Sequence, residues 1–165
     1  MSHVVVLIGS DTDRGAVKGS KMLDVFEAAG MRVPVHVISC HRNATELQQF
    51  CSESTADVFI AAAGRAAALP GAVAAATRMR KVVIGVPLDD FGVDTCIRLP
   101  AGVPVLTTGV GEAGLYNAAI AACQIVALGD ASVRDRLDRY LVGAERAPQF
   151  DVSLSDASPG AAVER

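Results

Sequence analysis

Three short polar clusters, each placed directly after an apolar run, hold the residue types of a site that binds phosphate and moves protons. The first follows the apolar residues 4–8 and reads Gly9-Ser10-Asp11-Thr12-Asp13. An apolar β-branched run that ends in Gly-Ser-Asp predicts a buried strand leading into a helix, where free backbone N–H groups collect and a phosphate can bind. The alternative is that Asp11 or Thr12 only caps that helix, a common role for these residue types.

The second cluster, Ser39-Cys40-His41-Arg42, follows an alternating apolar segment at residues 33–38. A histidine can exchange a proton near neutral pH, and an arginine offers a planar, permanently charged fork to a phosphate or a carboxylate. Taken alone, His41 fits a surface or packing residue, and Arg42 fits a solvated loop cation. Together with Ser10 and Thr12, the pair has the chemistry to hold a phosphorylated sugar and to protonate a group attached to it.

The third cluster, Gly64-Arg65, follows the apolar run at residues 58–63.

The elements that position the clusters are also indicated by the sequence. Pro34 removes a backbone donor from the segment before the second cluster, which favours a strand at the edge of a sheet. Asn43 and Glu46 resemble a capping box at the start of the helix that follows. Further strands are expected at 82–86 and 103–107, a loop at 88–99, and helices at 13–29, from Asn43 onward, at 69–78, 112–128 and 131–141.

This alternation of strands and helices predicts an α/β fold, a single three-layer α/β/α domain with a flavodoxin-like, doubly wound parallel sheet. In such sheets ligands bind beyond the carboxyl ends of the strands, near the point where the strand order reverses. Because all three clusters follow strands, we expect them to converge on one edge of the sheet. The candidate site residues are Gly9, Ser10, Asp11, Thr12, Asp13, Ser39, His41, Arg42, Gly64 and Arg65.

Length and composition fit a single globular domain with a sizeable core, since 51% of the 165 residues are hydrophobic and 20% are charged. The net charge is −3 and the basic residues are scattered, so neither a nucleic-acid-binding stripe nor a membrane-binding patch is expected. The first apolar run is too short for a signal peptide or a membrane span, which favours a cytoplasmic protein. We expect the domain to cover residues 1–146 and residues 147–165 to form a polar, disordered tail.

The four cysteines lack the spacing of a metal site, and an intracellular protein would keep them as thiols. Cys51, Cys96 and Cys123 are most simply core residues, whereas Cys40 lies in a polar loop beside His41.

Residues 109–114, Gly-Val-Gly-Glu-Ala-Gly, match the pattern G-x-G-x-x-G, but we reject a dinucleotide site. That fingerprint belongs to a first βα unit and needs a following strand that ends in an acidic residue, and no such strand is expected here. The glycines are instead expected to allow close helix–sheet packing or close approach of the backbone to a ligand. A receiver-like or flavin-binding module is disfavoured, because Asp57 precedes its strand and the chain has only five Phe and two Tyr.

Several segments between residues 4 and 128 together form a recognisable pattern. They are GSDTD at 9–13, SCHR at 39–42, AGRAAALPG at 63–71, GVP at 85–87 and LPAGVPV at 99–105, followed by Asn117-Ala118-Ala119. In this order and at this spacing they closely resemble the PurE family of aminoimidazole ribonucleotide carboxylases and N-carboxyaminoimidazole ribonucleotide mutases.

The resemblance implies a subunit of a homo-octamer, with active sites at subunit contacts and no metal or organic cofactor. The family binds the ribose 5′-phosphate and the ring of an aminoimidazole ribonucleotide. By motif, Ser10, Asp13 and Arg42 match its substrate-binding residues and His41 matches its catalytic acid–base. In the mutase, a carbamate loses carbon dioxide into a small pocket and the ring carbon captures it while the histidine moves protons. Such chemistry depends on positioning and on exclusion of water.

The chain departs from the family pattern around the third cluster. Arg65 stands where the family has a second glycine and Ala68 where it has a histidine, which adds bulk and charge and removes a polar side chain. The 88–99 loop is shorter than usual, and Cys40 replaces a common alanine.

The function implied is that of an enzyme of purine-type metabolism that carboxylates a 5′-phosphoribosyl aminoimidazole nucleotide or rearranges its carboxylate. The alternative is a relative in nucleoside-metabolite biosynthesis that acts on another heterocycle, by decarboxylation or by phosphoribosyl transfer from phosphoribosyl pyrophosphate. Arg65 would suit either a carboxylate or a pyrophosphate.

Overall fold

The computed structural model describes residues 3–144, which form a five-stranded parallel sheet in the order β2-β1-β3-β4-β5. The expected tail at 147–165 lies outside the described residues. The sheet order confirms the flavodoxin-like, doubly wound arrangement, with the reversal between β1 and β3. The strands are β1 (Val4–Ile8), β2 (Val35–Val37), β3 (Val58–Ala63), β4 (Val82–Pro87) and β5 (Leu106–Thr107).

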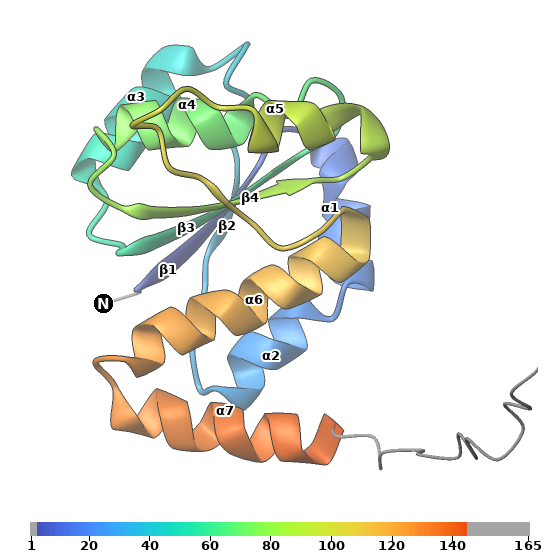
Figure 1. The fold of residues 1–165 in the computed structure, drawn as a ribbon, viewed down its shortest axis with the longest axis vertical. Helices are drawn as coiled ribbons and strands as arrows, with labels where there is room; N and C mark the ends of the chain where they lie inside the picture. Colours follow the sequence, from blue (N-terminus) through green and yellow to red (C-terminus); the bar gives the residue numbers. More distant parts are fainter. Residues whose placement is uncertain (1–2, 145–165) are drawn as a thin grey trace, which may run out of the picture.

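Helices cover both faces of the sheet, so the subunit has three layers (Figure 1). Figure 1 also shows α7 beneath α2 and α6, on the side away from the sheet. One face carries α1 (Arg14–Gly19), α2 (Met22–Ala28) and α6 (Gly111–Ala127), with α7 (Ala131–Ala144) outside them, and the other carries α3 (Ala44–Glu53), α4 (Leu69–Ala76) and α5 (Val93–Ile97).

Alternate residues of the central strands enter two separate cores, because successive side chains of a strand point to opposite faces. Val4, Val6 and Ile8 of β1 lie in the core beneath α2 and α6. Val5 and Leu7 lie in the core beneath α3 and α4. Burial on both faces explains why β1 and β3 read as continuous apolar runs rather than as alternating ones.

The outer strands are shorter than the sequence predicts. β2 spans only Val35–Val37, but it lies at the edge of the sheet, as the proline before it indicated. β5 begins only at Leu106, since the preceding segment contains a turn in which the Val103 N–H donates to the Pro100 carbonyl at 3.1 Å.

The prediction of one helix over residues 13–29 is wrong, because the helix breaks at Ser20 and Lys21. Lys21 has φ +58°, in the left-handed region, which ends α1 and starts α2 in a new direction. The Ser20 hydroxyl supports the break: it donates to the Val17 carbonyl at 2.9 Å and accepts from the Met22 N–H at 3.3 Å.

Two further local predictions are corrected. Asn43 does occupy the N-cap position of α3, but its side chain makes no capping hydrogen bond, so the capping box with Glu46 does not form. The expected loop at 88–99 contains the 3₁₀ turn η2 (Asp90–Gly92) and the short helix α5. Asp89 caps η2 by accepting a hydrogen bond from the Phe91 N–H at 3.1 Å.

The glycines of the 109–114 segment serve helix packing. A Cβ on Gly114 would lie 2.5 Å from the carbonyl carbon and oxygen of Gly109, so only glycine lets α6 start this close to the preceding turn. Thr108 reinforces the contact by donating from its hydroxyl to the Gly114 carbonyl at 3.0 Å. Of the two roles that the sequence left open for these glycines, the structure supports close packing.

Candidate active site

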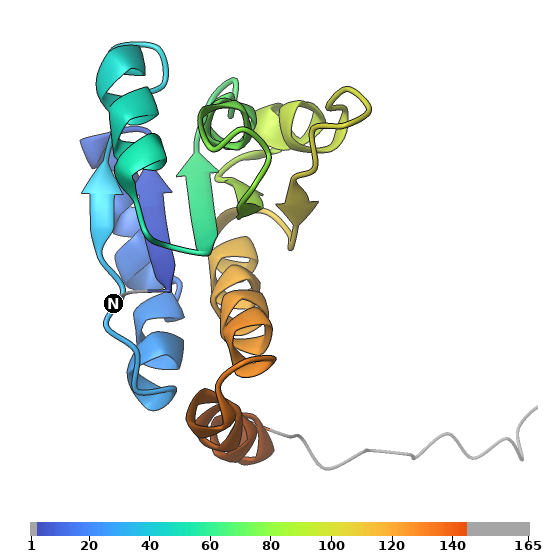
Figure 2. The same cartoon turned by 90° about the vertical axis from the view of Figure 1, so that its left-hand side faces the viewer.

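The loops after β1, β2, β3 and β4 surround a cleft of about 390 Å³ at the carboxyl edge of the sheet. In Figure 2 the arrowheads of β1, β2 and β3 point towards the same edge. The cleft therefore lies where a doubly wound sheet binds its ligands. Its lining comprises Gly9, Ser10, Thr12, Asp13, Ser39, Cys40, His41, Arg42, Ala63, Gly64, Arg65, Ala68, Leu69 and Asp89.

The loop after β1 presents a cluster of hydroxyl groups to the cleft. The Ser10 hydroxyl oxygen accepts from the Thr12 N–H at 3.4 Å and from the Thr12 hydroxyl at 3.0 Å, which caps the short 3₁₀ turn η1 (Asp11–Asp13). Both side chains also line the cleft. The cap is thus Ser10, not Asp11 or Thr12 as the capping alternative had it, and because Ser10 also lines the cleft, capping does not exclude ligand binding.

Asp11 differs from the other residues predicted for the site, because it does not line the cleft. Its carboxylate accepts a hydrogen bond from the Arg14 Nε at 2.6 Å, in an exposed ion pair three residues along the chain. The sequence alone did not distinguish the two faces of this turn, so Asp11 was included with its neighbours.

Arg42 links the loops after β1 and β2. Its Nη2 donates to the Gly9 carbonyl at 3.4 Å, and its backbone N–H donates to the Ser39 hydroxyl at 3.3 Å. Ser39 is buried, whereas His41 and Arg42 are exposed at the cleft. His41 and Arg42 thus line the same cleft as Ser10 and Thr12 of the first loop, as the strand-end rule predicts.

Cys40 is a cleft residue that the sequence singled out only by its place in the loop. Its thiol is half-buried, and burial raises the pKa of that thiol, so it stays protonated at neutral pH. Cys51, Cys96 and Cys123 are buried, in agreement with their predicted core positions, and all four cysteines are free.

Two carboxylates face the backbone of Gly64 across the cleft. A Cβ on Gly64 would lie 3.7 Å from Asp89 Oδ2 and 3.9 Å from Asp13 Oδ1. Burial raises the pKa of Asp13; hydrogen bonds from the backbone at Ser10 and Gly9 counter the rise, and the Asp89 charge adds to it. Asp89 was not predicted as a site residue. The signal in the sequence is an aspartate two residues after the end of a strand, and it accepts a hydrogen bond from the N–H of Phe91, two residues further on.

The Gly64 loop has an unusual backbone. Ala66 and Ala67 have φ +63° and +25°, values that non-glycine residues adopt at a cost. The loop returns to regular structure at α4, where Pro70 occupies the first turn, as the sequence indicated. Arg65 and Ala68, the two departures from the family pattern, both line the cleft.

Neither a metal cluster nor a membrane span is found in the part of the chain that the structure describes. Within residues 3–144, no three His, Cys, Asp or Glu side chains are grouped as metal ligands. In the same range, every helix is too short or too polar to cross a bilayer.

The fold is a doubly wound α/β fold, and its polar cleft lies at the switch point of the sheet. The sequence pattern of the family described as AIR carboxylase matches residues 3–146, and the chain belongs to this family.

Named relatives agree with that assignment, and a solved structure agrees with the fold. The chain is 37% identical over 142 residues to an N5-carboxyaminoimidazole ribonucleotide mutase of Methanocaldococcus jannaschii, covering 83% of this chain and 87% of the relative. It is 34% identical over 171 residues to the mutase of Escherichia coli K12, covering 98% and 96%. The crystal structure of Treponema denticola PurE has the same fold, with a TM-score of 0.70 at 24% identity, covering 86% of this chain and 90% of that one.

Proposed function

We propose that this chain is an enzyme that acts on a 5′-phosphoribosyl aminoimidazole nucleotide, carboxylating it or rearranging its carboxylate. The observation that carries the proposal is the cleft, which Ser10 and Thr12 line together with His41 and Arg42. The names of the relatives, N5-carboxyaminoimidazole ribonucleotide mutases, support the same substrate class.

In this proposal the loops after β1 and β2 bind the 5′-phosphate. The Ser10 hydroxyl contributes a donor, which the Thr12 hydroxyl orients by donating to the Ser10 oxygen, and Arg42 contributes charge beside the Gly9 carbonyl. Arg42 is already held by the protein, so little side-chain entropy is lost when the phosphate binds. Asp13 faces the ligand from the first loop and Asp89 from the fourth, where each offers oxygens to ribose hydroxyls or ring amino groups.

His41 is the group we assign to proton transfer. It stands at the cleft, next in the chain to the arginine that anchors the phosphate. Formation of a carbon–carboxylate bond at a ring carbon requires the loss of the proton on that carbon, and decarboxylation requires its return. A histidine suits both directions because its ring nitrogen is able to accept the proton in one and to donate it in the other.

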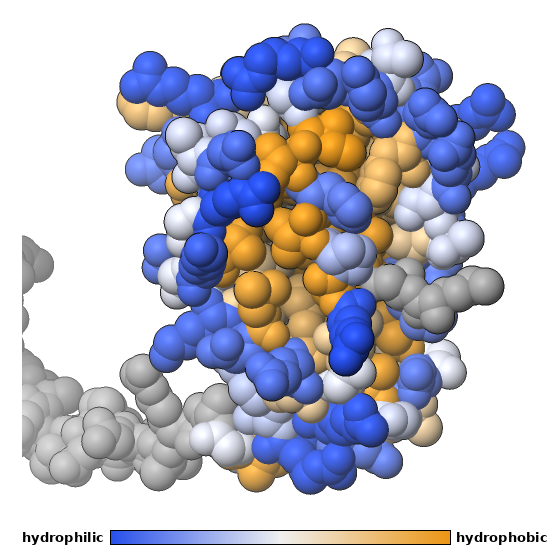
Figure 3. Space-filling view, turned by 180° about the vertical axis from the view of Figure 1, so that it is seen from behind, coloured by the Kyte–Doolittle hydropathy of each residue, from blue (hydrophilic) through white to orange (hydrophobic). Residues whose placement is uncertain are grey.

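We also propose that the protein assembles as a homo-octamer in the cytoplasm. On the face seen in Figure 3, apolar side chains gather at the centre, with some hydrophilic ones among them and more around them. The β2 edge of the sheet lies on this side, where Val35, Val37 and Ile38 remain partly exposed. An apolar area of this kind favours a subunit contact. The four free thiols favour a reducing compartment.

A substrate panel tests the proposed reaction. The protein is incubated with aminoimidazole ribonucleotide plus bicarbonate, with the N-carboxy derivative, and with phosphoribosyl pyrophosphate plus heterocyclic bases. We expect turnover in one of the first two mixtures. Turnover in the third mixture alone would show a phosphoribosyl transferase instead. That mixture is included because the charged Arg65 lines the cleft and would suit a pyrophosphate. Light scattering of the same sample measures the number of subunits.

A further inference from the structure

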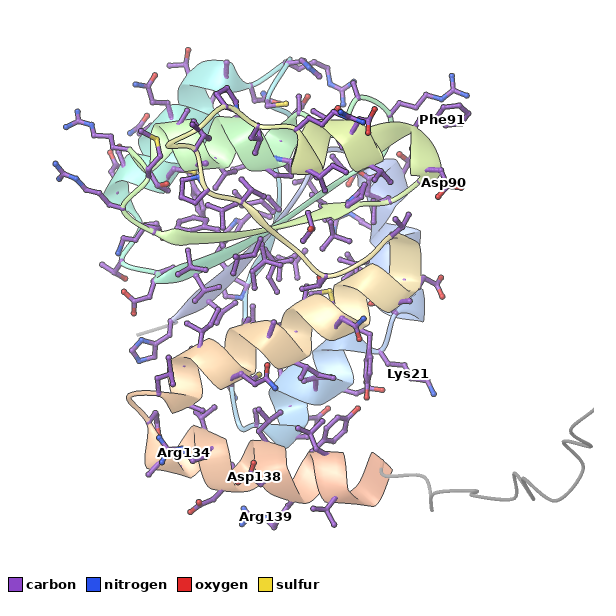
Figure 4. All side chains as sticks on the ribbon, viewed as in Figure 1. Lys21, Asp90, Phe91, Arg134, Asp138 and Arg139 are labelled. Atoms are coloured by element: carbon purple, nitrogen blue, oxygen red, sulfur yellow. The ribbon has the colours of Figure 1, made fainter. Side chains whose placement is uncertain are left out.

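An arginine and a phenylalanine meet at the rim of the cleft, and the proposed reaction gives neither of them a role. The Arg65 Cζ lies over the Phe91 ring, 5.4 Å from its centre, so the guanidinium and the ring make a cation–π contact. Phe91 is 77% exposed, an unusual state for a large apolar side chain. Figure 4 shows the labelled Phe91 ring projecting away from the body of the molecule.

Close packing of two backbones fixes this pair in place. A Cβ on Gly92 would lie 2.5 Å from the Ala67 Cβ and 3.3 Å from the Gly64 carbonyl oxygen, so the loops after β3 and β4 touch directly. The Leu88 N–H donates to the Ala63 carbonyl at 2.9 Å, which joins the same two loops where they leave the sheet. Asp89 also accepts a hydrogen bond from the Phe91 N–H, so the backbone on which Phe91 stands is fixed as well.

Arg65 has no countercharge in the part of the chain that the structure describes. Arg14 and Arg98 on the surface pair with Asp11 and Asp94 at 2.6 and 3.1 Å, but none of the ion pairs within residues 3–144 includes Arg65. Within residues 3–144 the contact of Arg65 with Phe91 is not a hydrogen bond, so it leaves the guanidinium N–H groups available. Such groups bind a planar anion through two parallel hydrogen bonds.

We propose that Arg65 binds a carboxylate carried by the heterocycle of the substrate, and that Phe91 is a positioning residue that holds the guanidinium plane at the rim. This inference rests on the proposed function, because the phosphate must occupy the Ser10 and Arg42 side of the cleft. A planar carboxylate matches the guanidinium fork in shape and charge. The site therefore selects carboxylated nucleotides over uncarboxylated ones.

Calorimetric titration of the full chain tests the selection. The ligands are aminoimidazole ribonucleotide, its 4-carboxy derivative, phosphoribosyl pyrophosphate and ribose 5-phosphate. We expect the wild type to bind the carboxylated nucleotide at least about tenfold more tightly than the uncarboxylated one, as for a charge-assisted pair. Arg65→Gln should abolish that preference and Phe91→Leu should reduce it several-fold. Phe91→Tyr, which keeps an aromatic ring, should retain it. Arg80→Gln, which removes an exposed arginine before β4 at the opposite edge of the sheet, should leave it unchanged.

Three results would overturn the inference. The first is a carboxylate preference that survives Arg65→Gln. The second is a preference that Phe91→Leu leaves intact. The third is tight binding of phosphoribosyl pyrophosphate that Arg65→Gln removes while the carboxylate preference is absent, because the arginine would then serve a diphosphate. Failure of the proposed function is distinguishable, since it appears as absent turnover in the substrate panel even where the carboxylate preference is measured.

Discussion

Replacing Gly92 with alanine should force apart the two loops that form the rim of the cleft. Gly92 has φ −92° and ψ −6°, a conformation open to alanine, so the backbone itself resists the change little. The added Cβ would lie 2.5 Å from the Ala67 Cβ and 3.3 Å from both the Gly64 carbonyl oxygen and the Pro87 Cβ. Carbon atoms prefer separations of about 3.5–4.0 Å, so one loop must move by about 1 Å.

The cost follows from what surrounds the new methyl group. Its neighbours are a buried alanine, a proline and a backbone oxygen, none of which can swing aside as the end of a long side chain would. Overpacking of this kind destabilises by about 1–3 kcal/mol. For a chain of this size, about 2–4 °C of Tm is lost per kcal/mol, so we expect a Tm lower by about 2–12 °C.

Urea unfolding followed by circular dichroism measures the effect, with Gly15→Ala as the matched control. A Cβ on Gly15, in the exposed helix α1, would meet nothing within 4 Å. That variant should gain up to about 1 kcal/mol, because alanine forms helix better than glycine. If Gly92→Ala unfolded at the same urea concentration as the wild type, the direct contact between the two loops would be refuted.

The remaining predictions concern the proposed acid–base, the α6 contact and two aspartates. His41→Asn should lower turnover by at least about 100-fold and leave nucleotide affinity within about threefold, as measured by activity assay and calorimetry; retained turnover would remove His41 from the mechanism. Gly114→Ala should cost about 1–3 kcal/mol in urea unfolding, because its Cβ would lie 2.5 Å from backbone atoms, and an unchanged midpoint would contradict that packing. Burial holds the pKa of Asp13 above its ordinary value, so the wild type loses stability as pH rises through the folded-state pKa; Asp13→Asn should remove this loss and be relatively more stable at neutral pH. A hydrogen bond from His3 lowers the pKa of Asp57, so that residue stabilises the fold above its unfolded pKa and the effect disappears as pH falls through the folded one. Asp57→Asn should therefore lower the free energy of unfolding by no more than about 1 kcal/mol at neutral pH and leave it unchanged in acid. If the urea midpoints of Asp13→Asn and Asp57→Asn shifted in the same direction at neutral pH, these assignments would be contradicted.

The sheet and the position of the cleft were predictable because the signals for them are local. β3 has the predicted bounds, and the start of β1 and the edge position of β2 follow from an apolar run and one proline. Every strand in a doubly wound sheet points its carboxyl end to one side, so three clusters far apart in sequence had to meet. That rule needs no knowledge of side-chain packing.

The corrections concern features that depend on contacts between segments or on competing hydrogen bonds. The break at Ser20 and Lys21 arises because a serine side chain satisfies backbone groups on both sides of it, while the apolar periodicity continues through the break. Asp89 reaches the cleft only because Gly92 lets its loop lie against the Gly64 loop. Asp11 is excluded by its pairing with Arg14, which no pattern of residue types distinguishes from a ligand-facing aspartate.

Because four strand ends line one cleft, a bound nucleotide would act as a non-covalent cross-link between Gly9 and Asp89, with two further loops between them. A ligand that binds only the folded chain adds stability according to its free concentration, about 2.7 kcal/mol at a hundredfold excess over its Kd. Slow hydrogen exchange should then extend across the loops of this edge when the nucleotide is present and fade from them together when it is removed. The concentration of substrate would thus affect the stability of these loops as well as the rate of the reaction.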